Sequence, residues 1–240
     1  MSDSSVPIVL FDMDGVLVDV SGSYRRAIQE TAAQFLGRPV APEEVQRYKN
    51  QGGFNDDWRL TEAIIRDGGL DVPFDDIRSS FDLRYRGETW NGFITQEPPL
   101  IPRAILRDVQ GRSAGMGIVT GRPRAEAEWT VHRFGWEPFF NVLVAMEDQD
   151  GRGKPDPYPM RVALTRFVEP GVDCSTKRTV YIGDSIDDMR SARAAGLRAI
   201  GFVPPYLAAT DLEQRLFDAG ADLVIDTHDR LIPALESLFG

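Results

Sequence analysis

The chain has 240 residues, of which 42% are hydrophobic and 27% are charged, and its formal net charge is −10. This length can hold one large domain or a core domain with an insert, and either would bury a sizeable apolar core. The acidic balance opposes binding to nucleic acid, and no apolar run approaches the roughly 18 residues that span a bilayer, so neither nucleic acid nor a membrane is an expected partner.

The cysteine content and the N-terminus bear on the cellular compartment. The one cysteine, Cys174, cannot form an internal disulfide, and the N-terminus lacks a basic segment followed by a long apolar stretch. We therefore expect a cytoplasmic protein. The sequence does not indicate an oligomeric state.

Short apolar runs bounded by turn residues predict buried strands along most of the chain. In chain order they are Val6–Phe11, Gly117–Thr120, Val142–Ala145, Val180–Ile182, Ala199–Val203 and Leu223–Ile225. Helical patterns lie between most of them, at Pro102–Gln110, Arg124–Phe134, Tyr158–Phe167, Asp187–Ala195 and Leu207–Asp218. Alternation of strands and helices predicts an α/β fold with a doubly wound, Rossmann-like parallel sheet.

The interval from Val18 to about Pro98 departs from this alternation. Its amphipathic patterns are Tyr24–Leu36, Pro42–Lys49, Trp58–Arg66 and Phe74–Trp90. They predict an all-helical domain at residues 19–94, inserted into a core made of residues 1–18 and 95–240. The proline-rich exit at Thr95–Pro102 is predicted to be an extended linker.

The first predicted strand ends in a pair of aspartates, Asp12 and Asp14, followed by Gly15. The carboxyl ends of strands in an open parallel sheet face the ligand crevice, so both carboxylates should lie there. Two carboxylates beyond a buried strand are costly unless a cation sits between them. An ordinary turn with side-chain hydrogen bonds is the alternative interpretation of these residues alone.

The second predicted strand leads into Thr120, Gly121, Arg122 and Pro123, just before a helix. A hydroxyl and the free N–H groups of a helix start form a cradle for phosphate. The same residues are also typical of a simple helix entry with proline at its first position. We assign Thr120 and Gly121 to the candidate site.

Lys154 is one of three lysines in the chain and lies in a loop between Gly153 and Pro155. A point charge held in a rigid loop can neutralise both a carboxylate and a transferring phosphoryl group. Asp156 is better explained as the N-cap of the following helix, so it is left out of the site.

The fourth predicted strand is followed by Gly183, Asp184 and Ser185, with Asp187 and Asp188 in the next helix. Carboxylate oxygens are the ligands that Mg²⁺ prefers in phosphate sites. Ser185 and Asp188 also have the spacing of a capping box. Asp184 and Asp188 are the predicted metal residues, with Asp187 as an open alternative to Asp188.

Together these residues resemble the four motifs of the haloacid dehalogenase superfamily, in the order that the family requires. The resemblance covers the core, and the helical insert resembles the C1 cap of that family. It implies a magnesium-dependent hydrolase of a small phosphorylated metabolite that reacts through a phosphorylated aspartate.

The resemblance also assigns roles by position. Asp12 would be the nucleophile and a metal ligand, while Asp14 would donate a proton to the leaving oxygen and offer its backbone carbonyl to Mg²⁺. Thr120 and Gly121 would hold phosphoryl oxygens. Lys154 would orient Asp12. Asp184 and Asp188 would complete the metal site.

Other activities share this fold. A dehalogenase needs neither Asp14 as proton donor nor Asp184 in an acidic cluster. A phosphomutase of the β-phosphoglucomutase type usually has glutamate where this chain has Gly183, and it remains an alternative. A phosphonoacetaldehyde hydrolase-like reaction would need an insert lysine, for which Lys49 is the one candidate. A non-catalytic relative would usually lack Asp12 or Asp184.

The insert is expected to supply substrate specificity through its loop at residues 50–58. The polar and flexible residues predicted to contact the leaving group are Asn50, Gln51, Gly52, Gly53 and Asn55. For Asp56, Asp57 and Trp58 an alternative is nearly as well supported, in which an aspartate caps the next helix and the tryptophan packs within the insert.

Several polar residues are not assigned to the site. His132 and His228 are predicted to lie away from the motif loops, in structural or surface positions. Glu147, Asp148 and Asp150 are interpreted as a charged, solvated loop rather than as metal ligands.

Overall fold

The computed structural model describes residues 6–51, 54, 56–167, 175–208 and 211–240. The chain forms two compact units. The core unit comprises Met1–Val18 and Pro99–Gly240, and the helical insert comprises Asp19–Pro98.

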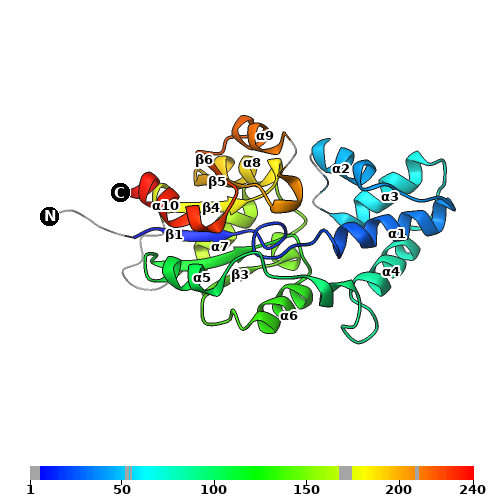
Figure 1. Ribbon diagram of the computed structural model, residues 1–240, viewed down its shortest axis with the longest axis horizontal. Coiled ribbons are helices and arrows are strands. Elements are labelled where there is room, and N and C mark those ends of the chain that lie inside the picture. The colour runs from blue at the N-terminus through cyan, green and yellow to red at the C-terminus, as the bar shows by residue number, and fades with distance from the viewer. Residues whose placement is uncertain (1–5, 52–53, 55, 168–174, 209–210) are drawn as a thin grey trace. The chain divides into compact units, whose positions relative to one another are not determined.

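The core unit is built on a parallel sheet (Figure 1). Its strands are β1 (Ile8–Phe11), β2 (Gly115–Val119), β3 (Val142–Val144), β4 (Thr179–Gly183), β5 (Arg198–Phe202) and β6 (Leu223–Ile225). Their order in the sheet is β3-β2-β1-β4-β5-β6. The residues of β1 are fully buried, as expected for a strand covered on both faces, which explains its continuous apolar run. The predicted doubly wound α/β fold with a helical insert is confirmed.

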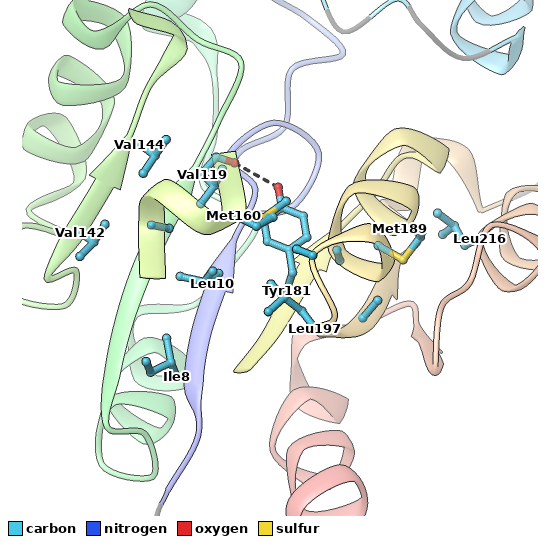
Figure 2. Packing of buried hydrophobic residues seen from close by; sticks show 14 of the residues in the cluster. Ile8, Leu10, Val119, Val142, Val144, Met160, Tyr181, Met189, Leu197 and Leu216 are labelled. Atoms are coloured by element: carbon cyan, nitrogen blue, oxygen red, sulfur yellow. Dashed lines mark hydrogen bonds between the residues drawn. The ribbon is translucent and has the colours of Figure 1, made fainter. Parts of the chain in front are cut away.

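Helices cover both faces of the sheet. They are α5 (Arg103–Gln110), α6 (Arg124–Phe134), α7 (Tyr158–Arg166), α8 (Ile186–Ala194), α9 (Leu212–Asp218) and α10 (Leu231–Phe239). On one face α7 packs on β2 and β3, and α8 packs on β4 and β5. Figure 2 shows Met160 of α7 and Met189 of α8 with Leu10 and Tyr181 in this layer. Helix α6 lies on the other face, where Val131 and Ile118 line one recess.

The strand order brings the loops that follow β1, β2 and β4 together at one edge of the sheet. After β1 the chain builds outward through β2 and β3, and then returns to the other side of β1 with β4. Such a reversal leaves a crevice at the carboxyl ends of the central strands. The Asp12 N–H donates to the Ile182 carbonyl, and the Thr120 N–H donates to the Val144 carbonyl, so strand pairing continues into these loops.

The described residues of the helical insert form α1 (Tyr24–Leu36), α2 (Pro42–Gln51), α3 (Asp57–Asp67), α4 (Phe74–Tyr85) and the 3-10 helix η1 (Phe93–Gln96). Helix α1 packs against α3 and α4. Tyr24 of α1 stacks on Tyr85 of α4 with 3.8 Å between ring centroids. Glu97 is buried and accepts hydrogen bonds from the hydroxyls of Ser23 and Tyr85.

Some predicted boundaries were wrong. Helix α4 ends at Tyr85 rather than Trp90, because Gly87 turns the chain with a φ of 72°. Thr95 belongs to η1 instead of an extended linker. The helix predicted from Leu207 begins at Leu212, after the short helix η4 (Pro205–Leu207).

The C-terminal helix α10 was not predicted.

Among the described residues, no helix has the length and apolar character required to cross a membrane.

Candidate active site

Three carboxylates meet at the carboxyl ends of β1 and β4. Asp12 follows β1, Asp184 follows β4, and Asp188 lies in the first turn of α8. One oxygen from each lies within 4.8 Å of the others. Asp12 and Asp188 are buried, and Asp184 is half-buried. The sequence predicted these three residues for one site, and the structure brings them together.

Lys154 lies against this acidic cluster. Its side chain is buried, with Nζ at 3.1 Å from Asp12 Oδ1 and 2.6 Å from Asp188 Oδ1. Burial alone would lower the pKa of Lys154, but the attraction of Asp12 and Asp188 is stronger and raises it. The lysine is therefore a permanent positive charge beside Asp12.

The charges around Asp12 do not balance. Burial raises the pKa of Asp12 well above its usual range, and the negative charges of Asp188, Asp14 and Asp184 raise it further, while Lys154 acts in the opposite direction. The cluster thus has an excess of negative charge carried by oxygen donors. This donor set fits a hard divalent cation such as Mg²⁺, which would relieve the repulsion and favour ionised Asp12.

Asp188 has two roles through its two oxygens. Its Oδ2 accepts hydrogen bonds from the N–H and hydroxyl of Ser185, and the Ser185 hydroxyl accepts from the Asp188 N–H. This is the capping box predicted from the sequence. The other oxygen, Oδ1, faces Lys154. Asp187 does not belong to the cluster formed by the described residues.

Tyr181 of β4 is a site residue that the sequence analysis missed. Lys154 Nζ donates to its hydroxyl at 3.0 Å. The hydroxyl donates to the Val119 carbonyl at 3.0 Å, which is the dashed line in Figure 2. The hydroxyl also lies 3.2 Å from Asp188 Oδ1. Burial raises the pKa of Tyr181, which keeps the phenol neutral. The signal was the tyrosine hydroxyl in the middle of a fully buried strand, where a polar group needs a hydrogen-bond partner.

The loop after β2 is held rigidly. Thr120 is fully buried, and its Oγ1 accepts a hydrogen bond from the Arg122 N–H at 3.1 Å. Gln149 Nε2 donates to the Thr120 carbonyl at 2.6 Å. Gly121, which lies between Thr120 and Arg122 in the chain, is exposed. Helix α6 begins at Arg124, so the loop also serves as the predicted helix entry, with Pro123 at the N-cap instead of the first helical position.

Asp14 is bound by an arginine. Arg122 Nε donates to Asp14 Oδ1 at 2.5 Å. The Arg122 side chain is fully buried, whereas the Asp14 side chain is 31% exposed. Arg122 lies within the Thr120–Pro123 motif, but no role was predicted for it, because the contact with Asp14 spans 108 positions in the chain.

Gly15 permits the sharp turn after Asp14. Its φ is 72°, in the left-handed region that favours glycine. A Cβ at this position would lie 2.0 Å from Asp184 Oδ2 and 3.1 Å from the Tyr206 hydroxyl. The close approach of the two loops therefore requires glycine here, and it also places Tyr206 at the edge of the cluster.

For Asp56 and Trp58 the structure supports helix capping and packing within the insert, rather than contact with a substrate. Asp56 accepts from the Arg59 N–H at 3.1 Å and caps α3. Trp58 Nε1 donates to Asp82 at 2.8 Å, and its ring packs edge-on against Phe81. Both contacts lie within the insert.

The predicted specificity loop is only partly described. Gln51 is the exposed last residue of α2, and Asn50 belongs to the same helix. Gly52, Gly53 and Asn55 lie outside the described residues, as does the side chain of Asn50.

His228 has the predicted structural position just after β6, but the prediction that it lies away from the motif loops was wrong. This histidine is buried, and its Nε2 lies 2.9 Å from the carbonyl of Val16, in the loop that follows Asp14. It therefore contacts the motif loop from a position 212 residues away in the chain. His132 is on the surface, as predicted, where it contacts Glu137.

The loop after β3 is charged and largely solvated, as predicted, since Glu147 and Asp150 are exposed and Asp148 is half-buried. Asp148 is bound by Arg124 and by Arg166, the latter at 2.7 Å. Glu147 accepts from the Arg124 N–H at 2.8 Å. These contacts fix the loop beside α6 and α7, and they account for both carboxylates without a metal.

Comparisons of the sequence and the fold relate this chain to known proteins. A family profile described as haloacid dehalogenase-like hydrolase matches residues 6–196. An N-acetylmuramic acid 6-phosphate phosphatase of Pseudomonas aeruginosa is 30% identical over 229 residues, covering 95% of this chain and 94% of the relative. An imidazoleglycerol-phosphate dehydratase of Phytophthora nicotianae is 34% identical over 215 residues, covering 87% of this chain but only 46% of the relative.

A solved structure shares the fold along its whole length. It is a haloacid dehalogenase-like protein of Agrobacterium tumefaciens, with a TM-score of 0.74 at 21% identity, covering 98% of this chain and 99% of that protein.

Proposed function

This chain belongs to the haloacid dehalogenase-like hydrolase family and is a phosphatase, and we propose that it hydrolyses small phosphomonoesters with Mg²⁺ through phosphorylation of Asp12. The observation that carries the proposal is the buried Asp12 carboxylate, held 3.1 Å from Lys154 and crowded by Asp184 and Asp188. A carboxylate attacks a phosphate dianion only if nearby cations offset their mutual repulsion.

Asp12, Asp184, Asp188 and the backbone carbonyl of Asp14 are the groups that would hold Mg²⁺. When bound, this ion would supply positive charge to the phosphoryl oxygens and to the attacking carboxylate. Lys154 adds a second positive charge and orients Asp12. The Tyr181 hydroxyl accepts a hydrogen bond from Lys154 Nζ and so fixes the position of the lysine.

The chemistry takes two steps. An oxygen of Asp12 attacks phosphorus, the bond from phosphorus to the ester oxygen breaks, and Asp14 gives its proton to the departing alcohol. Asp14 then takes a proton from water, and the resulting hydroxide attacks the phosphorus of the aspartyl phosphate. Phosphate leaves and the Asp12 carboxylate is restored. Thr120 and Gly121 bind phosphoryl oxygens through a hydroxyl and a backbone N–H.

The substrate class is inferred from the relatives. The Pseudomonas protein acts on a phosphorylated amino sugar, and less similar relatives include a pyrophosphatase and a phosphoglycolate phosphatase. These names support a small phosphorylated metabolite. We assign specificity to the helical insert, with Asn50, Gln51, Gly52, Gly53 and Asn55 as its proposed contact loop.

The two alternative reactions, a phosphonoacetaldehyde hydrolase-like reaction and a phosphomutase, differ in how well the structure supports them. Lys49 Nζ forms an ion pair with Asp57 at 2.5 Å and donates to the Phe54 carbonyl. A lysine held in this way is poorly suited to attack a carbonyl group, which argues against the phosphonoacetaldehyde hydrolase-like reaction. A phosphomutase would isomerise a sugar phosphate without releasing phosphate, so product analysis distinguishes it.

The test is release of phosphate by the purified protein with and without Mg²⁺. Substrates are 4-nitrophenyl phosphate and a metabolite panel that includes N-acetylmuramic acid 6-phosphate, phosphoglycolate, pyrophosphate and imidazoleglycerol phosphate. We expect turnover that EDTA abolishes and Mg²⁺ restores. Asp14→Asn, quenched in acid, should carry one phosphoryl group by intact mass, and Asp12→Asn should not. A wild-type protein that releases no phosphate from any ester would refute the proposal.

A further inference from the structure

Arg122 is a buried arginine whose charged end meets the carboxylate of Asp14. The side chain of Arg122 is fully buried, and Nε lies 2.5 Å from Asp14 Oδ1. The Nε–H group can donate to Oδ1 whether or not the other oxygen, Oδ2, carries a proton, so the contact can be kept when Asp14 acts as an acid and when it acts as a base. Neither the phosphate-binding role of Thr120 nor the proposed chemistry of Asp12 requires such a contact.

The arginine is fixed at several points. Its Nη1 donates to Thr130 Oγ1 of α6 at 3.0 Å, and Thr130 is itself fully buried. Its backbone N–H donates to Thr120 Oγ1 at 3.1 Å, and its carbonyl accepts from the Met146 N–H at 2.9 Å. Arg122 is therefore a rigid element that joins the β2 loop to α6.

Asp14 is less constrained by packing than Arg122. It lies in the turn after β1, next to Gly15, and its side chain is 31% exposed. A partly exposed carboxylate in a turn can adopt several rotamers, whereas a proton donor must lie within hydrogen-bond reach of its acceptor. The fixed guanidinium restricts the direction in which this carboxylate points.

We propose that Arg122 is a positioning residue that aims Asp14 at the leaving oxygen and so lets the enzyme cleave esters of weakly acidic alcohols. This inference rests on the proposed function. General acid catalysis contributes about 10²- to 10⁴-fold to rates, and a misplacement of about 1 Å can cost about 10²-fold. Loss of Arg122 should therefore matter most where the leaving group needs its proton.

A purely structural role predicts something different. If Arg122 only supported the Thr120 loop, its loss would weaken phosphoryl binding for every ester to the same extent. The two roles are separated by esters that share a phosphoryl group and differ in the acidity of the alcohol. Phenyl phosphate and 4-nitrophenyl phosphate form such a pair, since phenol has a pKa of about 10, as tyrosine does, and nitrophenol is more acidic.

The experiment measures kcat/KM for both esters with Mg²⁺, in wild type and in Arg122→Gln. This parameter includes departure of the alcohol but not the later hydrolysis of the aspartyl phosphate. The ratio of the two values comes from one preparation, so any misfolded fraction cancels. Arg122→Lys and Thr130→Val are milder variants that disturb the same contact between Arg122 and Asp14. The matched control is Arg124→Gln, which removes an arginine that pairs with Glu128 and Asp148 instead.

For Arg122→Gln we expect kcat/KM to fall about tenfold or more further for phenyl phosphate than for 4-nitrophenyl phosphate, as for a displaced general acid. Arg122→Lys and Thr130→Val should change the ratio in the same direction by less, and Arg124→Gln should leave it unchanged. Equal losses for both esters in the Arg122 and Thr130 variants would overturn the positioning role. A wild-type protein inactive on both esters would instead overturn the proposed function, and this inference with it.

Discussion

Replacing His228 with glutamine should reduce the loss of stability that the protein undergoes between pH 7 and pH 5. In the native protein His228 is buried, its ring lies 4.3 Å from that of Phe202, and Nε2 is in place to donate to the Val16 carbonyl at 2.9 Å. Burial lowers the pKa of His228 from 6.5 to about 4, although the hydrogen bond to Val16 acts in the opposite direction. The folded protein therefore keeps this ring neutral in mild acid.

The sign and the size follow from proton linkage. The unfolded chain binds a proton at His228 near pH 6.5, whereas the folded chain binds it only near pH 4. The stability contributed by the neutral ring is present above pH 6.5 and is lost as the pH falls toward 4. At about 1.4 kcal/mol per pH unit, His228 should account for a loss of about 2 kcal/mol between pH 7 and pH 5.

The assay is urea unfolding followed by circular dichroism at the two pH values. Glutamine keeps an N–H donor for the Val16 carbonyl but does not titrate, and all carboxylates remain the same. The difference between wild type and His228→Gln in pH-dependent loss thus isolates the histidine. If both proteins lose the same free energy of unfolding from pH 7 to pH 5, the ring is not held neutral and the reasoning is wrong.

Four further substitutions test the site. Asp12→Asn should abolish turnover without lowering the thermal midpoint in EDTA, because it removes one of several crowded charges; retention of a tenth of the rate would contradict the mechanism. Lys154→Met should lower the free energy of unfolding by about 3–5 kcal/mol, since it leaves buried carboxylates without their cation; an unchanged urea midpoint would argue against the pair. Tyr181→Phe should lower kcat more than it raises KM, because it loosens Lys154 rather than substrate contacts; a change in KM alone would contradict this. Gly15→Ala should abolish the stabilisation of the protein by Mg²⁺ in thermal unfolding, because its Cβ would displace Asp184; a wild-type response would contradict the clash.

The parts of the fold that the sequence predicted well are local. Each buried strand has its own apolar run, and Asp12, Thr120 and Asp184 follow their strands directly. Parallel pairing then brings those strand ends to one edge, so the acidic cluster could be anticipated from strand ends alone.

The contacts that were missed join distant parts of the chain. Arg122 meets Asp14 across 108 positions, and His228 meets Val16 across 212. Neither residue has a local pattern that distinguishes it from a surface arginine or histidine. Tyr181 was missed for another reason, since its place in a continuously buried strand indicates that its ring is buried but not where its hydroxyl ends.

The ends of the helical insert lie next to each other, so the insert can be exchanged as a unit. The Asp19 N–H donates to the Pro98 carbonyl at 3.0 Å, and nearby the Ser23 hydroxyl donates to buried Glu97 at 2.6 Å. A segment whose termini are already hydrogen-bonded can be excised or exchanged with little loop-closure entropy. Residues 19–98 thus form a cassette, and a chimera that carries the corresponding cassette of a relative tests whether substrate preference moves with the insert.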